Sequence, residues 1–504
     1  MNLEAVIGLE IHIQLKTKSK MFCRCNNMSE GAAPNTLICP ICTGHPGTLP
    51  LPNKQAIRWA VMAAQALGCT IPEHTKFDRK HYTYPDLPKG YQISQYDEPI
   101  GVRGALTVQV DAQPRTIGIT RVHVEEDVGK LLHVGGQTLI DYNRAGTPLV
   151  EIVTEPDIRT PAEAKAFLQE LRLIMRFLGV SNADMEKGEL RCDANISLRP
   201  KGDKNLYSKS EIKNLNSFRA VERALGYAQV FQENWWKNAF KSGKLKKELI
   251  PSPRTYGYRE DTDSPLVEQR DKETSADYRY FPEPDIPPLH FTPEFLSKVR
   301  AETPELPSAK RHRFVEMYGL PIDLSSRLVE DRELAAYFEE VVTELRTYAD
   351  GELGREGGET FWRDRKPEAT SLAANWLLNR IPVEHRTAQG RSVPPADLGR
   401  LLWMVFHGTV TTAGAMQVYE GMVRTRKGPH ALVQELGLER LRDAAWLDPI
   451  VAQVINDNPE QVKQYRRGKT AVLQFLIGQV MRKTKGRVDA EAVRQALEQA
   501  MPAE

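Results

Sequence analysis

The sequence lacks the features that would place it in a membrane, in a disulfide scaffold or on a uniformly basic nucleic-acid surface. Its 504 residues contain no run of about 18 uncharged apolar residues, so no membrane-spanning helix is expected. Six cysteines are too few to form a disulfide scaffold in a chain of this length. The 68 basic and 66 acidic residues leave a net charge of +2, so any RNA-binding surface must be local.

Several sequence motifs for nucleotide binding and nucleophilic catalysis are also absent, which excludes some kinds of site. There is neither a G-x-x-x-x-G-K-[ST] phosphate loop nor a G-x-G-x-x-G turn after a strand. A bound nucleotide would therefore be held by metal ions, side chains and irregular loops. There is no serine-rich amidase signature and no plausible cysteine nucleophile, so ammonia would have to come from another protein chain. No basic stretch or short apolar segment precedes Glu4, so we expect no targeting signal and a cytoplasmic protein.

The distribution of turn-forming residues and hydrophobic periodicity predicts three parts. Residues 1–292 hold most of the glycine and proline and the alternating segments, which indicates a β-rich catalytic body. Long helical patterns follow, with an acidic, glycine-rich break at residues 350–359. We therefore expect an α+β chain with a body at residues 1–292, a helical connector at residues 293–395 and a helical tail at residues 396–504.

Three helices are predicted within the body, at residues 57–67, 160–179 and 218–240. The second is the best signalled, because Thr160 and Glu163 form a capping box with Pro161 at the first helical position. Gly179 is placed to end that helix.

Three segments alternate apolar and polar residues in the manner of half-buried strands. At residues 6–15 the odd positions are apolar, so Glu10 and His12 point to the opposite face, about 6.5–7 Å apart. At residues 191–199 the alternation places Asp193 and Asn195 on one face. Carboxylate, amide and imidazole groups in such rows suggest a site for Mg²⁺, and an ordinary exposed strand face is the alternative.

The third segment, residues 117–127, ends in three consecutive carboxylates, two of which are Glu125 and Glu126. Consecutive strand residues point to opposite faces. Glu125 and Glu126 therefore cannot both point inward unless the strand ends or bulges there, and the pattern leaves the choice between them open.

Four of the six cysteines form two close pairs, Cys23 with Cys25 and Cys39 with Cys42. Short-spaced pairs of thiols can supply four ligands to a tetrahedral Zn²⁺ without chain strain. We expect a closed structural zinc site, with reduced free thiols as the alternative. The two remaining cysteines, at positions 69 and 192, lie on apolar faces and are expected to be buried.

Two loop segments and the tail concentrate positive charge. Residues 76–92 and 141–148 combine cations with aromatic or turn-forming residues, which suits phosphate binding and base stacking; ordinary surface loops are the alternative. Residues 460–487 contain eight cations and one acid, on both sides of an apolar helical stretch. This pattern predicts RNA binding, against the alternative of an ordinary solvated surface.

Several long motifs resemble the B subunits of the aspartyl/glutamyl-tRNA(Asn/Gln) amidotransferases over nearly the whole chain. They are VIGLEIH at residues 6–12, FDRKHY at 77–82, YQISQ at 91–95, LRCDANISLR at 190–199, EIKNLNSF at 211–218 and DYRYFPEPD at 277–285. Residues 465–481 are similar to the tRNA-binding tail of that family. Two segments, residues 228–276 and 343–370, differ from the usual family pattern.

The resemblance implies a glutamine-synthetase-like catalytic fold and an ATP- and Mg²⁺-dependent reaction. Such B subunits phosphorylate the side-chain carboxylate of Glu-tRNA(Gln) or Asp-tRNA(Asn), and ammonia from an amidase partner then forms the amide. The implied partners are the amidase (A) subunit, the small C subunit of the heterotrimer and the misacylated tRNAs, with a non-discriminating synthetase as a further candidate. A non-catalytic tRNA-binding scaffold and a free-standing ammonia ligase remain the alternative functions.

The matching motifs also suggest roles for individual residues. The expected catalytic groups are Glu10, His12, Lys80, Glu125, Glu126, Asp193, Asn195 and Glu211. Those expected to bind magnesium are Glu10, His12, Glu126 (or its neighbour Glu125) and Glu211. Those expected to face nucleotide or acyl-phosphate charge are Lys80, Arg144 and Arg191. The four clustered cysteines match the zinc-bearing members of the family, and the expected RNA-binding residues are Lys463, Arg466, Arg467, Lys469, Arg482, Lys483 and Lys485.

Overall fold

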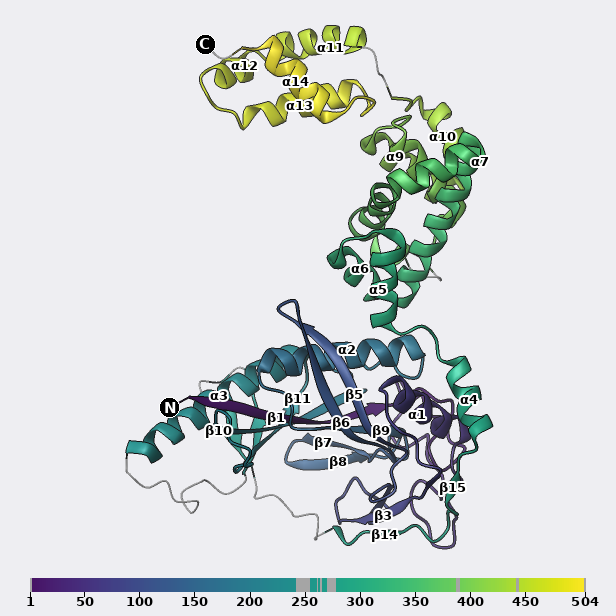
Figure 1. Ribbon diagram of the computed structural model, residues 1–504, viewed down its shortest axis with the longest axis vertical. Coiled ribbons are helices and arrows are strands. Elements are labelled where there is room, and N and C mark those ends of the chain that lie inside the picture. Colours follow the sequence, from purple (N-terminus) through teal and green to yellow (C-terminus); the bar gives the residue numbers. More distant parts are fainter. Residues whose placement is uncertain are drawn as a thin grey trace. The chain divides into compact units, whose positions relative to one another are not determined.

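The computed structural model describes residues 2–241, 254–260, 262, 265–269, 278–386, 390–440 and 444–502. The chain divides into two compact units, Met1–Pro307 and Ser308–Glu504. The first unit contains a large sheet with helices and the second is helical, so the predicted α+β class is confirmed (Figure 1). In the described part of the chain, no helix is long and apolar enough to cross a membrane.

The first unit is built around an eight-stranded sheet with the strand order β13-β12-β11-β10-β1-β9-β6-β5. Its strands are β1 (Leu3–Gln14), β5 (Gly101–Val110), β6 (Gln113–Glu126), β9 (Pro148–Thr154), β10 (Leu190–Pro200), β11 (Ser210–Leu215), β12 (Arg254–Tyr258) and β13 (Leu266–Glu268). Neighbouring strands are antiparallel except β11 and β12, which are parallel. The three strands predicted from alternation are β1, β6 and β10.

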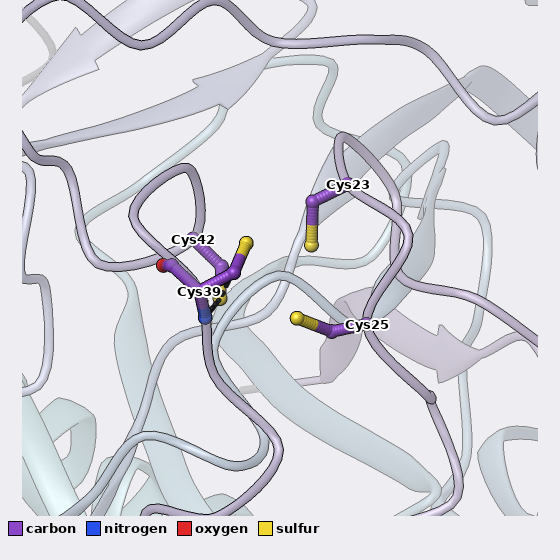
Figure 2. A group of neighbouring side chains, drawn as sticks. All are labelled: Cys23, Cys25, Cys39 and Cys42. Carbon is purple, nitrogen blue, oxygen red and sulfur yellow. Dashed lines mark hydrogen bonds between the residues drawn. The ribbon is translucent and has the colours of Figure 1, made fainter.

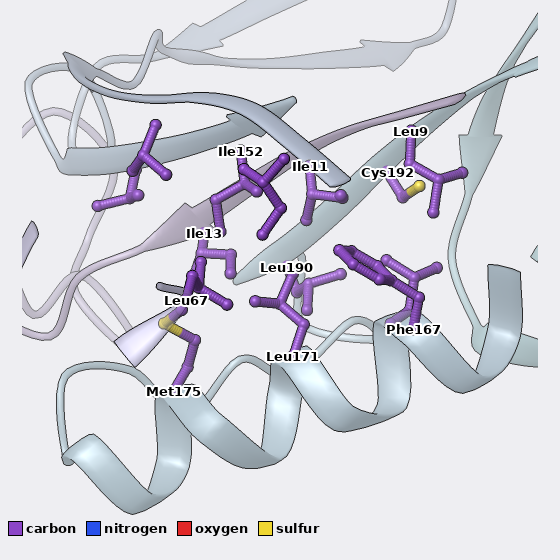
Figure 3. Packing of buried hydrophobic residues seen from close by; sticks show 14 of the residues in the cluster. Leu9, Ile11, Ile13, Leu67, Ile152, Phe167, Leu171, Met175, Leu190 and Cys192 are labelled. Carbon is purple, nitrogen blue, oxygen red and sulfur yellow. The ribbon is translucent and has the colours of Figure 1, made fainter. Parts of the chain in front are cut away.

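One face of this sheet is apolar and is covered by the helices α1 (Lys54–Ala66), α2 (Pro161–Leu178) and α3 (Phe218–Lys241). Ile11 and Ile13 of β1 are fully buried, and they point toward Leu171 and Met175 of α2 (Figure 3). All three predicted helices are present. The start of α2 is capped as predicted, because the Thr160 hydroxyl accepts a hydrogen bond from the Glu163 amide at 3.1 Å.

The polar face of the sheet is partly covered by a smaller sheet of order β14-β3-β4. Its strands are β14 (Phe281–Pro282), β3 (Asp78–His81) and β4 (Tyr91–Ser94). The side chain of Gln92 donates a 2.7 Å hydrogen bond to the Glu126 carbonyl, which holds β4 against the end of β6. Residues 76–92 were expected to be a loop, and that expectation is wrong for Asp78–His81 in β3 and for Tyr91 and Gln92 in β4, because these residues pair within the small sheet.

The first unit also contains elements outside these two sheets. Two short ribbons pair β2 with β15 and β7 with β8, and one helix, α4, follows them in the chain. Their bounds are β2 (His74–Thr75), β7 (Lys130–Val134), β8 (Gln137–Asp141), β15 (Leu289–His290) and α4 (Pro293–Glu302).

The second unit consists of helices. They are α5 (Pro307–Tyr318), α6 (Ile322–Val329), α7 (Arg332–Asn379), the 3₁₀ turn η3 (Val383–His385), α8 (Pro395–Phe406), α9 (Thr412–Thr425), α10 (Pro429–Leu436), α11 (Ala444–Asp457), α12 (Pro459–Arg466), α13 (Val472–Lys483) and α14 (Ala490–Ala500). The last four share a hydrophobic core of their own, centred on Val454, Leu476, Val480 and Leu497.

The break expected at residues 350–359 is a kink rather than a loop. Gly354 adopts φ 74° and ψ 163°, which only glycine adopts readily, and helical geometry continues on both sides of it within α7. The divergent segment at residues 343–370 therefore lies in α7. Of the other divergent segment, residues 242–253, 261, 263–264 and 270–276 lie outside the described residues. The boundaries expected at residues 292/293 and 395/396 stay predictions.

The packing of α2 on β1 leads to a stability prediction. Leu171→Ala should lower the free energy of unfolding by about 2–5 kcal/mol, because it leaves a cavity at a site with 0% exposure. Thermal and denaturant unfolding of the full chain measure the change. Leu51→Ala, at a site with 60% exposure, is the control and should have little effect. Equal effects of the two substitutions would contradict the proposed core.

Candidate active site and metal centres

Three side chains converge on the polar face of the large sheet. His12 of β1 lies opposite Glu151 of β9 in the strand register, and β6 brings Glu125 beside them. His12 Nε2 is 3.4 Å from Glu125 Oε1 and 3.5 Å from Glu151 Oε2. One potential ligand atom from each residue lies within 4.8 Å of the other two. Two carboxylates and one imidazole at this spacing can hold a divalent cation such as Mg²⁺.

The electrostatics of this group suit a cation. Burial raises the pKa of Glu125, and the nearby carboxylate of Glu151 raises it further. Burial alone would disfavour the charged imidazole, but Glu151 and Glu125 raise the pKa of His12 to about 9. A proton on His12 thus supplies the positive charge that the two carboxylates require. A bound divalent cation would supply the same charge in its place.

Lys80 of β3 extends this group from the small sheet. Its side chain is surrounded by aromatic rings, with Nζ 4.7 Å from the ring centre of Tyr278 and 5.9 Å from that of Tyr82. Burial opposes its charge, but the carboxylates of Glu125 and Glu151 keep the pKa of Lys80 above its usual value. The carboxylates of Glu125 and Glu151 therefore favour a charged Lys80, and its expected role toward nucleotide or acyl-phosphate charge stays a prediction.

A second polar group lies farther along the same face. The Asn195 side-chain amide donates a 3.1 Å hydrogen bond to Glu10 Oε1. Lys213 Nζ lies 3.1 Å from Asp193 Oδ2 and 4.0 Å from Glu211 Oε1, so it balances part of their charge. The structure brings together these four predicted residues, Glu10, Asp193, Asn195 and Glu211. In the described chain they are separate from the three-ligand cluster at His12.

A cavity of about 240 Å³ opens beside this second group. Its lining includes Gly8, Glu10, Thr154, Pro156, Asn195 and Tyr207. Asn195 is 9% exposed, and its Oδ1 atom is buried without a hydrogen-bond partner among the described residues. A buried oxygen of this kind favours a ligand that donates a hydrogen bond, because an unmade bond is costly.

Three further predicted residues, besides those of the second polar group, also lie outside the three-ligand cluster at His12. Glu126 forms an ion pair with Lys89 and accepts a 3.0 Å hydrogen bond from the Ile93 amide. Arg191 lies 2.8 Å and Arg144 lies 3.6 Å from the carboxylate of Asp127. Glu125 therefore lies beside His12, whereas Glu126 contacts a different set of residues; which of the two binds a metal stays a prediction.

Sequence reasoning missed Glu151 and Lys213. Glu151 is the only charged residue in β9, and the residues around it are almost all buried. A single carboxylate within an apolar strand was therefore the available signal, because such a group requires a partner. Lys213 lies in a matched motif and alternates with Glu211 along β11, which could have shown that the two share a face.

The four clustered cysteines converge as predicted. The sulfur atoms of Cys23, Cys25, Cys39 and Cys42 lie within 4.8 Å of one another and point toward a common centre (Figure 2). The Cys23 side chain, the Cys39 amide at 3.2 Å and Lys20 hold the pKa of Cys42 well below its usual value. This donor set fits a tetrahedral Zn²⁺. The other two cysteines are buried in the core.

The tail cations lie near both ends of α13. All seven predicted RNA-binding residues, Lys463, Arg466, Arg467, Lys469, Arg482, Lys483 and Lys485, are exposed. The helix between the two groups has 12 residues and thus spans about 18 Å. Two of the lysines are partly neutralised, since Lys463 lies 3.3 Å from Glu460 and Lys483 lies 2.7 Å from Asp457.

Comparison with known proteins gives matches over nearly the whole chain. Residues 5–297 match the family model described as the GatB/GatE catalytic domain, and residues 364–501 match the GatB domain. Proteins named as the B subunit of aspartyl/glutamyl-tRNA(Asn/Gln) amidotransferase are similar throughout. Those of Dehalococcoides mccartyi and Thermomicrobium roseum are 45% and 46% identical, with 99% of each chain covered. That of Carboxydothermus hydrogenoformans is 42% identical, with 98% of each chain covered.

Glu125 lies beside His12 and Glu126 pairs with Lys89, and this difference leads to a prediction about cation binding. Glu125→Gln should weaken Mn²⁺ binding by at least about tenfold, because it removes one of the three clustered ligand groups. Glu126→Gln should leave the Mn²⁺ affinity within about twofold while lowering stability, because it removes the charge that balances the buried Lys89. Titration calorimetry and circular dichroism measure the two effects. The reverse pattern would mean that the ligand has been assigned to the wrong residue.

Proposed function

Because this chain belongs to the family of aspartyl/glutamyl-tRNA(Asn/Gln) amidotransferase B subunits, we propose that it activates the side-chain carboxylate of a misacylated tRNA with ATP and Mg²⁺. Members of this family are ligase-type transamidation enzymes and work within a multi-subunit complex. The proposed substrates are Glu-tRNA(Gln), Asp-tRNA(Asn) or both, and the predicted location is the cytoplasm.

The reaction needs activation because a carboxylate is anionic and has no good leaving group. In the proposed first step a carboxylate oxygen of the aminoacyl group attacks the terminal phosphorus of ATP, and ADP leaves. Ammonia then attacks the carbonyl carbon of the acyl phosphate, the bond to the phosphate oxygen breaks, and inorganic phosphate leaves with formation of the amide. Positioning and charge neutralisation are the main contributions that a protein makes to such phosphoryl transfer.

The observation that carries this proposal is the cluster of His12, Glu125 and Glu151 in a chain that lacks a phosphate loop. These three residues would hold Mg²⁺, which when bound neutralises charge on the transferring phosphoryl group. Lys80 faces the same carboxylates and would orient and neutralise the acyl phosphate. In this proposed ligand set Glu125 takes the place that sequence reasoning gave to Glu126. Glu151 is added to the set, and Glu10 and Glu211 are left out of it.

The second group and its cavity support binding of the nucleotide. Gly8 and His12 are four residues apart on β1, a separation of roughly 13 Å along a strand. An extended nucleoside triphosphate covers such a span, whereas a lone phosphate does not. We propose that Glu10, Asp193 and Glu211 lie toward the phosphates. Asn195 would accept a hydrogen bond from the nucleoside with its unpaired oxygen. In this assignment Arg144 and Arg191 support Asp127 rather than contact the nucleotide.

Two features suggest the partners: the sequence shows no nucleophile for releasing ammonia, and the tail carries exposed cations. No nucleophile for releasing ammonia from glutamine is evident in the sequence, so we propose that an amidase, the A subunit of the complex, supplies ammonia and that the small C subunit completes the heterotrimer. The exposed cations at both ends of α13 are proposed to contact tRNA phosphates. A non-discriminating synthetase is a further proposed partner, and zinc is assigned a structural role.

The proposed chemistry predicts the effect of removing His12. His12→Ala, assayed in the complex with its partners, should abolish ATP-dependent conversion of Glu-tRNA(Gln) to Gln-tRNA(Gln), because it removes one cation ligand and the counter-charge of two glutamates. Glutamine hydrolysis by the amidase partner should remain at least in part. Conversion without ATP would contradict the mechanism. Binding of tRNA without any ATP cleavage by the wild-type complex would favour the non-catalytic scaffold.

The tail predicts a salt-dependent loss of tRNA affinity. Replacing Arg466, Arg467 and Lys469 together by Gln should weaken tRNA binding and reduce the slope of log affinity against log salt by about one for each phosphate that is no longer neutralised. Filter binding over a series of salt concentrations measures both. Arg355→Gln, at a site with 91% side-chain exposure in α7, is the control. An unchanged slope would remove the tail from the RNA interface and favour a ligase that acts on a small molecule.

A further inference from the structure

A lysine lies buried beside the four cysteines. Lys20 follows β1, and its side chain is 0% exposed. Its Nζ atom is 3.7 Å from Cys42 Sγ and 3.4 Å from the carbonyl oxygen of Tyr142. The backbone also fixes its position, because the Lys20 amide donates a 3.0 Å hydrogen bond to the Cys25 carbonyl.

The charge of Lys20 requires an explanation. Among the residues that the structure describes, Lys20 has no carboxylate partner, and its two side-chain contacts are a sulfur atom and a carbonyl oxygen. A buried ammonium group without a counter-charge strongly destabilises a protein. The thiolates of the cysteine cluster are the nearest group that can carry negative charge. Four thiolates also exceed the positive charge of one Zn²⁺ by two units, so the cluster in turn requires a cation.

We propose that Lys20 is the charge-compensating residue of the zinc centre and holds that centre against the turn at residues 141–148. This inference rests on the proposed zinc site. Lys20 contacts the cluster through Cys42 and the turn through Tyr142. In the same turn the Gly146 carbonyl accepts a 2.7 Å hydrogen bond from the Met21 amide, and Arg144 lies 3.6 Å from Asp127. Lys20 therefore joins the zinc loop to the turn at residues 141–148. Through Arg144, the same turn contacts Asp127, which directly follows Glu125 and Glu126 in the chain.

The test compares zinc affinity in variants of the full-length chain. Lys20→Met keeps the length of the side chain but removes its charge, so we expect zinc affinity to fall about 10- to 100-fold, as for other residues that support metal ligands. Competition with a chromophoric zinc chelator measures this affinity. Lys18→Met changes an exposed lysine two residues earlier and should leave zinc affinity unchanged.

A second variant and hydrogen exchange test the same role of Lys20. If Lys20→Met does not fold, Lys20→Gln retains a donor for the Tyr142 carbonyl without the charge, and the same loss of zinc affinity is expected. Hydrogen exchange at residues 141–148 should increase in a Lys20 variant that still holds zinc. Zinc affinity within about twofold of wild type in the Lys20 variants would overturn the role of Lys20 alone. A wild-type chain that binds no zinc would overturn the zinc site as well.

Discussion

The alternation of side chains along β1 is the constraint on which the site depends. Leu9, Ile11 and Ile13 are buried against the helices, so Glu10 and His12 are forced onto the other face of the sheet. Because β1 lies inside the sheet, those two side chains meet groups from neighbouring strands on both sides. A shift of the register by one residue would bury the polar side chains and expose the apolar ones. The same hydrophobic packing that stabilises the body therefore also sets the geometry of the proposed cation site.

The polar face is a balanced network of charges rather than an acidic patch. Lys80 and His12 face Glu125 and Glu151, while Lys213 lies between Asp193 and Glu211. Such pairing lowers the cost of holding many ionised groups away from water. Because these groups are already paired, a cation or phosphate that binds here must replace an existing partner of the groups it contacts. Selectivity among ligands would then depend on how well each one replaces the internal counter-ions.

Local patterns in the sequence correctly predicted those structural features that depend on residues close together in the chain. The alternation in β1, the capping box at Thr160 and the close spacing of the cysteine pairs all survive in the structure, because each depends on residues near one another in the chain. The missed features depend on distant pairing. Glu151 lies in the site only because β9 is placed between β1 and β6. Asp127 forms ion pairs with Arg144 and Arg191, which are distant from it in the sequence or lie on another strand, so no local pattern predicts these contacts. The choice between Glu125 and Glu126 likewise depends on the contacts of β6 with the small sheet.

The adjacency of Glu125 and Glu126 restricts how the protein can change during evolution. One peptide bond separates a residue that faces the cation cluster from the buried partner of Lys89. A replacement at position 89 would therefore disturb Glu126, the chain neighbour of a proposed cation ligand, even though the described contacts of Lys89 include none of the three clustered residues. Positions 89, 125 and 126 should consequently accept substitutions only in compatible combinations. A substitution at one of these positions would restrict which amino acids the other two can accept. The order in which substitutions arise would therefore matter as much as their identity.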